Sequence, residues 1–342
     1  MHNFGHSRAF FFNLVLLMVC SRAVGAQEPP PCTIRKLSVS FRDGQNLPLQ
    51  NISVSDLEGK VHGKPVKILS LAPDQRPHRL VLMLDTSGSI GASAMDAPLW
   101  DLELFLARHF FEMNHQRSQI ALLFFNDKVN EVIDFSEGNS AVAHKLQQVG
   151  EDRDYLKNHL KGRTALRDAI LQGVQLLDHP TSADAVYLLT DGGDNASAHS
   201  ASDLLRRLAV TAVRVFAVLL YRSAGYRTRT PEEISGPEEL SEVALKSGGE
   251  ILTAAEWQGK SVALSANAEA KVRSEEMLNR LYLTILQDKL LEIELPFPIA
   301  KNERWELKLS NAAHHQWKNA QIVYSNILVG CNAEVFGSGR RP

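Results

Sequence analysis

The central part of the chain alternates short apolar runs with segments of helical periodicity. The apolar runs are uncharged and bounded by polar turns, as expected for strands buried on both faces, and they cover residues 80–84, 120–125, 185–189 and 215–220. Segments in which apolar side chains recur every three or four positions cover residues 100–111, 165–177, 202–208 and 238–245. This alternation predicts an α/β fold, a doubly wound and mostly parallel sheet with helices on both faces.

The two ends of the chain show other patterns. Residues 32–74 contain short runs with alternating apolar side chains and turn signals, which predict strands, and residues 72–77 are expected to link them to the central part. Residues 291–329 alternate again, and we expect them to pair with the N-terminal strands in a small β unit. Between them, an apolar stripe predicts a long core-packed helix over residues 268–290.

The first 26 residues have the pattern of a secretory signal peptide. Arg8 gives a weakly basic start, residues 9–20 are apolar except for Asn13, and small residues occupy positions 24–26. An uncleaved anchor is the alternative. No later stretch is both long and uncharged enough to span a bilayer. We therefore expect an exported protein, periplasmic or secreted, without a transmembrane segment in the mature chain.

Size and charge narrow the functional classes. A chain of 342 residues is long for one domain, and 44% hydrophobic with 22% charged residues is typical of a soluble globular protein. The formal net charge of -2 gives no electrostatic reason to expect nucleic acid as a partner. The predicted parts are the signal peptide at 1–26, an N-terminal β segment and linker at 27–76, an α/β domain at 79–256, and a C-terminal helix with strands at 257–342.

The cysteines suggest a disulfide. Once Cys20 leaves with the signal peptide, Cys32 and Cys331 remain, one near each end of the mature chain, in a compartment that permits disulfides. We predict that they pair, and two buried free thiols are the alternative. Closing so long a loop is worth roughly 5 to 6 kcal/mol in the chain-entropy model, which is an upper figure.

Oxygen-bearing side chains follow the ends of two predicted strands. Asp85, Ser87 and Ser89 lie in D-T-S-G-S after the first apolar run, Asp191 lies in Y-L-L-T-D-G-G after the third, and Thr164 lies in G-R-T-A-L-R-D-A. Ligands of such sheets bind beyond the carboxyl ends of the strands. Taken singly, each residue has a structural alternative, because serine, threonine and aspartate after a strand often cap the next helix. Together they indicate one site for a divalent cation.

The residue types define the chemistry of that site. Magnesium prefers oxygen ligands, and hydroxyl groups bind it without adding negative charge. A metal with few direct carboxylates stays electrophilic and attracts a carboxylate from outside. The cofactor that we expect is Mg²⁺, with Mn²⁺ and Ca²⁺ as alternatives.

These motifs carry a resemblance to a known family. D-T-S-G-S at 85–89, the threonine of G-R-T-A-L-R-D-A and the aspartate of L-L-T-D-G-G resemble the three parts of the metal-ion-dependent adhesion site of von Willebrand factor type A domains, over residues 79–256. The whole layout is similar to bacterial von Willebrand factor A-related proteins often found in acidobacteria. The resemblance implies that Ser87, Ser89 and Thr164 contact the ion directly, and that Asp85 and Asp191 act largely through water.

The resemblance also implies a function. The first hypothesis is an exported adhesion-type module whose metal captures an Asp or Glu carboxylate of a protein partner, with Asp194, Asn195 and Arg222 as candidates for the rim. An accessory factor that assembles an envelope protein complex is the alternative. A metal-dependent hydrolase is a third hypothesis, but no general base with a nucleophile lies near the motif, so we do not expect an enzyme.

Overall fold

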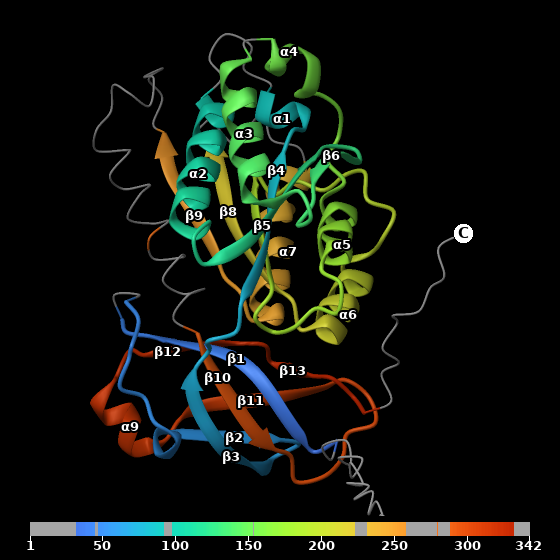
Figure 1. The fold of residues 1–342 in the computed structure, drawn as a ribbon. Helices are drawn as coiled ribbons and strands as arrows, with labels where there is room; N and C mark the ends of the chain where they lie inside the picture. The colour runs from blue at the N-terminus through green and yellow to red at the C-terminus, as the bar shows by residue number, and fades with distance from the viewer. Residues whose placement is uncertain are drawn as a thin grey trace, which may run out of the picture. The chain divides into compact units, whose positions relative to one another are not determined.

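The computed structural model describes residues 32–44, 47–91, 98–152, 154–222, 231–257, 279 and 288–331. These residues form a six-stranded sheet with helices and a separate seven-stranded sheet (Figure 1). The predicted fold class, an α/β sheet with an additional β unit, is confirmed. The predicted signal peptide lies outside the described residues.

The six-stranded sheet runs in the order β6-β5-β4-β7-β8-β9. Its strands are β4 (His78–Asp85), β5 (Ser118–Phe125), β6 (Val129–Ile133), β7 (Ala185–Thr190), β8 (Arg214–Arg222) and β9 (Ile251–Trp257). β4 pairs in parallel with β5 and β7, β8 pairs in parallel with β7 and β9, and only β6 is antiparallel to its neighbour. The sequence pattern missed β6, because this edge strand has no fully buried residue.

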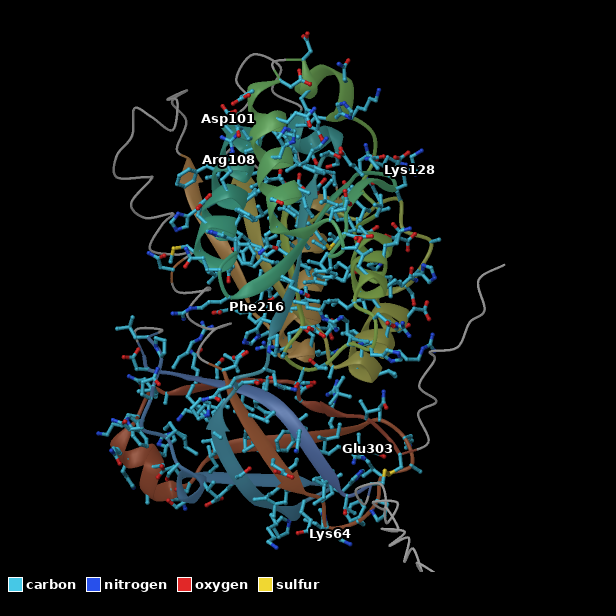
Figure 2. All side chains as sticks on the ribbon, in the orientation of Figure 1. Lys64, Asp101, Arg108, Lys128, Phe216 and Glu303 are labelled. Carbon is cyan, nitrogen blue, oxygen red and sulfur yellow. A yellow bond between two sulfur atoms is a disulfide. The ribbon has the colours of Figure 1, made fainter. Side chains whose placement is uncertain are left out.

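Helices cover both faces of this sheet, and alternate side chains of each strand enter different hydrophobic clusters. Leu80 and Leu84 of β4 pack in one cluster with Phe216 of β8 (Figure 2). Val81 and Met83 pack in the other cluster. The longer helices of the first cluster are α2 (Pro98–Asn114) and α3 (Gly138–Glu151), and those of the second are α5 (Leu166–Leu176), α6 (Ala201–Thr211) and α7 (Pro231–Ser247).

The four predicted helices of the central part are confirmed as α2, α5, α6 and α7, with ends shifted by a few residues. The sequence pattern missed α3, whose buried residues are only Val142, Leu146 and Val149. The remaining helices are short: η1 (Val54–Asp56), α1 (Gly88–Gly91), α4 (Tyr155–His159) and α9 (Asn311–Gln316). Among the described residues, no helix combines the length and the apolar character needed to cross a membrane.

The seven-stranded sheet is antiparallel and combines the two ends of the described chain, in the order β12-β1-β10-β3-β2-β11-β13. Its strands are β1 (Ile34–Arg42), β2 (Leu57–Val61), β3 (Lys64–Pro73), β10 (Lys289–Glu294), β11 (Glu303–Leu309), β12 (Gln321–Tyr324) and β13 (Ile327–Leu328). Because only Ser325 and Asn326 separate the two edge strands, the sheet curls around its own core, which includes Val39, Leu291 and Trp305. The predicted pairing of the tail with the N-terminal strands is confirmed.

The predicted end of the long helix at residue 290 is wrong. Lys289–Glu294 form strand β10, which pairs with β1 on one side and with β3 on the other. The segment alternates, with Leu291 and Ile293 buried, so its period of two matches a strand between two partners better than a helix. Asn279 is helical, and the other residues of 268–287 lie outside the described part of the chain.

The connection between β3 and β4 is held by polar contacts. Nε of Arg76 donates to Asp74 at 2.8 Å, and Nη2 of Arg76 donates to Oγ of Ser182 at 3.0 Å. Oγ of Ser38 lies within 3.2 Å of Asp74. The segment that the sequence suggests as a linker therefore contacts both the β1 strand and the loop before β7.

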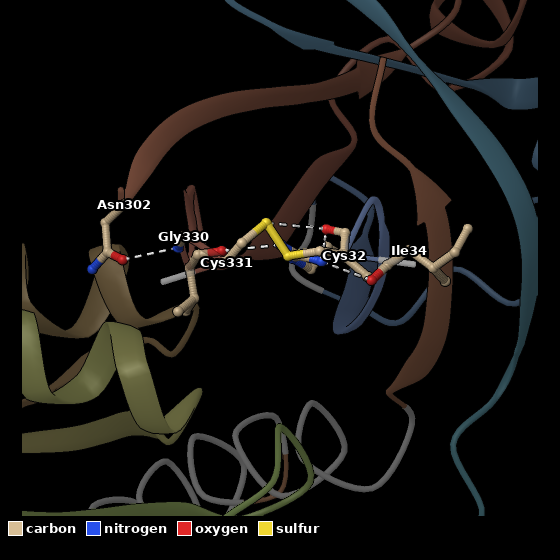
Figure 3. Close-up of a disulfide and its surroundings, with 7 residues drawn as sticks. Cys32, Ile34, Asn302, Gly330 and Cys331 are labelled. Atoms are coloured by element: carbon tan, nitrogen blue, oxygen red, sulfur yellow. Dashed lines mark hydrogen bonds between the residues drawn. A yellow bond between two sulfur atoms is a disulfide. The ribbon is translucent and has the colours of Figure 1, made fainter. Parts of the chain in front are cut away.

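The predicted disulfide between Cys32 and Cys331 is present, with the two Cα atoms 5.9 Å apart (Figure 3). Hydrogen bonds hold the C-terminal side of the bridge, from the Cys331 N–H to the Ile299 carbonyl at 2.7 Å and from the Gly330 N–H to Oδ1 of Asn302 at 3.1 Å. The bridge closes a separation of 299 residues, from just before β1 to just after β13.

Candidate metal centre

Asp85 is the last residue of β4, and Asp191 follows the last residue of β7 directly. β4 lies between β5 and β7 in the sheet, and both strands run parallel to it. The two aspartates therefore lie at the carboxyl ends of neighbouring strands. Asp85 is completely buried, and Asp191 is partly exposed.

Hydrogen bonds fix the Asp85 carboxylate. Oγ1 of Thr190 donates to its Oδ2 at 2.6 Å, and the Ser87 N–H donates to its Oδ1 at 2.9 Å. Thr190 in turn accepts the Gly192 N–H at 3.1 Å, which joins the loop after β7 to the end of β4. The carboxylate is held in one orientation by groups from both loops.

Burial and a neighbouring charge make the ionised form of Asp85 unfavourable. Burial first, and then the charge of Asp191, raise the pKa of Asp85 to about 7, although the hydrogen bonds from Thr190 and Ser87 favour the carboxylate. A buried acidic group that is repelled by a second acidic group is stabilised when a cation lies between or beside the two. The two acidic groups at the ends of β4 and β7 therefore favour a bound cation.

The hydroxyl groups of Ser87 and Ser89 lie side by side, with their Oγ atoms 3.0 Å apart. Thr86 fixes the backbone between the end of β4 and the two serines. Its N–H and its hydroxyl both donate to the Phe125 carbonyl, at 2.6 and 2.9 Å. Ser87 is buried, and Ser89 is partly exposed. The loop thus presents two neutral oxygens at fixed positions next to the Asp85 carboxylate.

The loop that carries Thr164 is bound to both of the other loops. The Gly88 N–H donates to the Gly162 carbonyl at 3.0 Å. The Thr164 N–H donates to Oδ1 of Asn195 at 2.9 Å, and the Asn195 N–H returns to the Thr164 carbonyl at 3.0 Å. Thr164 is buried at this junction of three loops.

The two acidic-loop residues that the sequence suggests as rim candidates have structural partners. Asp194 accepts the Arg167 N–H at 2.9 Å and the Ser197 hydroxyl at 2.8 Å. Asn195 binds the Thr164 backbone, as described above. These contacts place the loop after β7 against the start of α5, a role that sequence analysis did not assign to them. Arg222 ends β8, and its side chain lies outside the described part of the structure.

Sequence analysis missed Glu103, which lies directly behind Asp85. It is completely buried in α2, and its Oε1 accepts the Asp85 N–H at 2.6 Å. Burial, followed by the charge of Asp85, raises the pKa of Glu103 well above its ordinary value. The sequence did contain a signal, because Glu103 lies one helical turn from Leu99 and Leu106 on the apolar face of α2.

The donor set matches a hard cation. Three neutral hydroxyl groups and two carboxylates are oxygen ligands of the kind that Mg²⁺ takes. Within the described residues, no group of three or more His, Cys, Asp or Glu side chains is arranged for a metal ion. A cation at this position would therefore depend on the hydroxyl groups of Ser87, Ser89 and Thr164, and it would keep room for an external ligand.

Comparison with known protein families identifies the central part of the chain. Residues 80–193 match the model of the von Willebrand factor type A domain, and this match spans β4 to β7 with all five candidate ligands. No curated protein matches the chain significantly.

Several solved structures show a distant likeness. A von Willebrand factor type A protein from Catenulispora acidiphila is 11% identical, over 92% of this chain and 78% of that one, with a TM-score of 0.40. The PilB minor pilin of Streptococcus sanguinis is 13% identical, over 63% of this chain and 62% of the pilin, with a TM-score of 0.39. Proximal thread matrix protein 1 of the mussel byssus, with a zinc-occupied MIDAS motif, is 17% identical, over 64% of this chain and 48% of that one, with a TM-score of 0.43.

Proposed function

The chain contains a von Willebrand factor type A domain, and we propose that this domain binds Mg²⁺ at the candidate metal centre and through it a carboxylate of a protein partner. The observation that carries the proposal is the buried Asp85 carboxyl, whose pKa rises to about 7 beside Asp191. The fixed hydroxyl groups of Ser87 and Ser89 lie next to it. A protein with such an arrangement at the carboxyl ends of its strands is stabilised when a cation binds there.

Each residue of the centre has a proposed role. The hydroxyl groups of Ser87, Ser89 and Thr164 would hold the ion directly, and Asp85 and Asp191 would supply negative charge, largely through bound water. The ion, when bound, supplies positive charge and a coordination position for an Asp or Glu of the partner. Mn²⁺ and Ca²⁺ are alternative ions. We propose a binding module rather than an enzyme, since domains of this family are usually binding modules.

The disulfide supports an exported protein. Cys32 and Cys331 are bridged, and bridges of this kind persist in oxidising compartments. We therefore propose that the first 26 residues direct export, and that the protein acts in the periplasm or outside the cell. Residues 79–256 would form the binding domain, and the segments on either side would form the disulfide-closed β unit.

The proposal is tested by titrating the full chain with MgCl₂ in an isothermal titration calorimeter. We expect wild type to bind one ion and the Asp85→Ala variant to bind none. Asp178→Ala is the matched control, because Asp178 is an exposed aspartate in the loop after α5. Circular dichroism confirms that each variant is folded.

A second titration tests the carboxylate. A short peptide with one central glutamate should bind wild type in MgCl₂, and it should not bind after EDTA is added or when glutamine replaces the glutamate. Peptide binding that persists in EDTA and in the Asp85→Ala variant would refute the proposed mechanism.

A further inference from the structure

We propose that the partner of the metal centre presents an acidic segment, in which further acidic side chains flank the coordinating carboxylate and contact Lys128, Lys161 and Arg163. This inference rests on the proposed function and specifies the partner of the same site. The three cations are called the basic rim below. Lys128 belongs to the turn between β5 and β6, and Lys161 and Arg163 belong to the loop before α5.

Lys161 and Arg163 belong to the loop that carries Thr164. The Lys161 N–H donates to the Thr86 carbonyl at 3.1 Å, within the D-T-S-G-S loop itself. The hydrogen bond from the Gly88 N–H to the Gly162 carbonyl joins the same two loops, and Gly162 lies between the two cations in the sequence. Both side chains are exposed. The backbone therefore holds two cations within three residues of a proposed metal ligand, with their charged ends in solvent.

Lys128 lies in the turn between β5 and β6 (Figure 2). Its carbonyl accepts the Asn126 N–H at 2.9 Å, which closes the turn. The Asn126 carbonyl accepts the Ala165 N–H at 2.7 Å, directly after Thr164. Lys128 is also exposed, so the turn presents a third cation beside the loop of Lys161 and Arg163.

The basic rim is not neutralised within the described residues. Among these residues, neither Lys128 nor Lys161 forms an ion pair, and Arg163 donates to the neutral Asn195 carbonyl at 3.2 Å. Arg167, in contrast, pairs with Glu239 at 2.6 Å and Lys145 pairs with Glu131 at 2.5 Å.

Among the described residues, Asp127 is an acidic neighbour of the basic rim. Asp127 is exposed, and its Cγ lies 3.9 Å from the position that a β-carbon on Gly162 would occupy. Three cations against Asp127 leave the rim with a positive charge, and a bound divalent ion would offset the charges of Asp85 and Asp191 beside it.

A positive rim on an acidic protein selects partners by charge. The whole chain has a formal net charge of -2, so an acidic partner is repelled by the molecule as a whole and attracted at the rim. A single glutamate uses the metal alone, whereas an acidic segment also places carboxylates against the three cations. The rim thus adds affinity and orientation for a partner whose coordinating residue lies in an acidic stretch.

Calorimetry with two capped nonapeptides tests the inference on the full chain in MgCl₂ at low ionic strength. One peptide carries a single central glutamate among glycines and serines, and the other carries two aspartates on each side of that glutamate. We expect the acidic peptide to bind wild type at least about tenfold more tightly, the sum of several surface charge pairs. This advantage should shrink in 0.5 M NaCl, because salt screens exposed charges.

Charge reversal assigns the advantage to the rim. In the Lys161→Glu/Arg163→Glu variant the acidic peptide should bind no more tightly than the single-glutamate peptide, and Lys128→Glu should remove part of the advantage. Lys318→Glu, which reverses an exposed lysine after α9, should change nothing. MgCl₂ binding should persist in every rim variant, which shows that the metal centre is intact.

The outcomes separate the rim from the metal mechanism. Equal binding of the two peptides in MgCl₂, or an advantage that survives the double reversal, overturns the rim and leaves the metal centre standing. Acidic-peptide binding that needs the rim but is unchanged by EDTA supports the rim and refutes the metal mechanism. The inference is overturned if the acidic peptide binds under no condition. It is also overturned if a single-stranded oligonucleotide binds the protein more tightly than the acidic peptide does.

Discussion

At the scale of single residues, Asp85 is the centre of the account. Its carboxyl is buried, repelled by Asp191, and held by hydrogen bonds from Thr190 and Ser87. Burying an acidic group without a cation is unfavourable, and proteins keep such groups mainly where they act. The free energy of a bound cation would offset this cost.

The pKa of Asp85 predicts how Mg²⁺ affinity depends on pH. The pKa is about 7 without metal, and the ion binds the centre only when this carboxyl is ionised. Above pH 7 the affinity should be nearly constant, and below pH 7 protons compete, so the affinity should fall by up to about tenfold per pH unit. Calorimetry from pH 5.5 to 8, in buffers with different ionisation enthalpies, measures both the affinity and the proton released. A flat profile over this range would contradict the pKa of Asp85.

Glu103 is expected to support Asp85 from behind. In Glu103→Leu the buried Asp85 N–H loses its acceptor, so we predict a loss of about 1–3 kcal/mol in the free energy of unfolding. Glu103→Gln keeps a carbonyl oxygen at that position and should lose less. Urea denaturation measures both, with Glu112→Leu at an exposed position of α2 as the control. If Glu103→Leu is as stable as Glu112→Leu, Glu103 does not support Asp85 in this way.

At the scale of elements, the strands and helices of the central part could be predicted because buried strands leave uncharged runs and amphipathic helices leave a period near 3.6. The pattern failed where burial is weak or ambiguous. β6 is half-exposed, and β10 alternates within a segment that also continues a helical stripe. The pairing of β10 with β1 and β3 makes this segment a strand. A local sequence pattern does not show such long-range pairing.

The same distinction applies to the candidate site. Asp85, Ser87, Ser89 and Asp191 could be named because the end of a parallel strand is visible in the sequence. The contacts that order the site, such as Thr190 with Asp85, join residues far apart in the chain, and only the three-dimensional structure reveals them.

The packing of α7 against the loop after β7 gives a prediction for a helical glycine. A β-carbon on Gly236 would overlap the Gly192 carbonyl, with the carbonyl carbon at 2.8 Å, and backbone there cannot yield cheaply. A β-carbon on Gly150 of α3 would meet the guanidinium end of Arg108, a long side chain that can shift although its Nη2 donates to the Leu146 carbonyl at 2.9 Å. Alanine has the higher helix propensity by about 1 kcal/mol, but Gly236 directly precedes Pro237, which also disfavours a β-carbon in helical backbone, so the difference between the variants reports the clash together with this restriction.

We predict that Gly236→Ala lowers the free energy of unfolding by about 1–3 kcal/mol and that Gly150→Ala leaves it unchanged or raises it. Urea denaturation of the two variants side by side measures the difference. Equal stabilities would show that α7 does not pack directly on this loop.

At the scale of the whole molecule, the two ends of the described chain meet in one sheet and are closed by the disulfide. The sequence predicted this bridge from the number of cysteines and the export signal, and it predicted the strand pairing from alternation alone. It could not predict the buried ion pairs between distant segments, such as Arg42 with Glu250 at 2.5 Å and Arg214 with Asp288.

Removal of the disulfide should destabilise the protein. The Cys32→Ser/Cys331→Ser variant is predicted to lose about 2–5 kcal/mol in the free energy of unfolding, because its unfolded chain is no longer closed into a loop of 299 residues. Urea denaturation with and without reductant measures the loss. Reductant should lower the stability of wild type to that of the variant and leave the variant unchanged. Two alkylatable thiols in unreduced wild type would contradict the bridge.

The central claim is that the loops after β4, before α5 and after β7 together hold a metal ion. The most direct test is an anomalous difference map from crystals grown in MnCl₂. We expect one peak at about 2.0–2.2 Å from the hydroxyl oxygens of Ser87 and Ser89, on the side of Asp85 and Asp191. A map without a peak at these hydroxyl groups, at an ion concentration that saturates the protein in calorimetry, would contradict it.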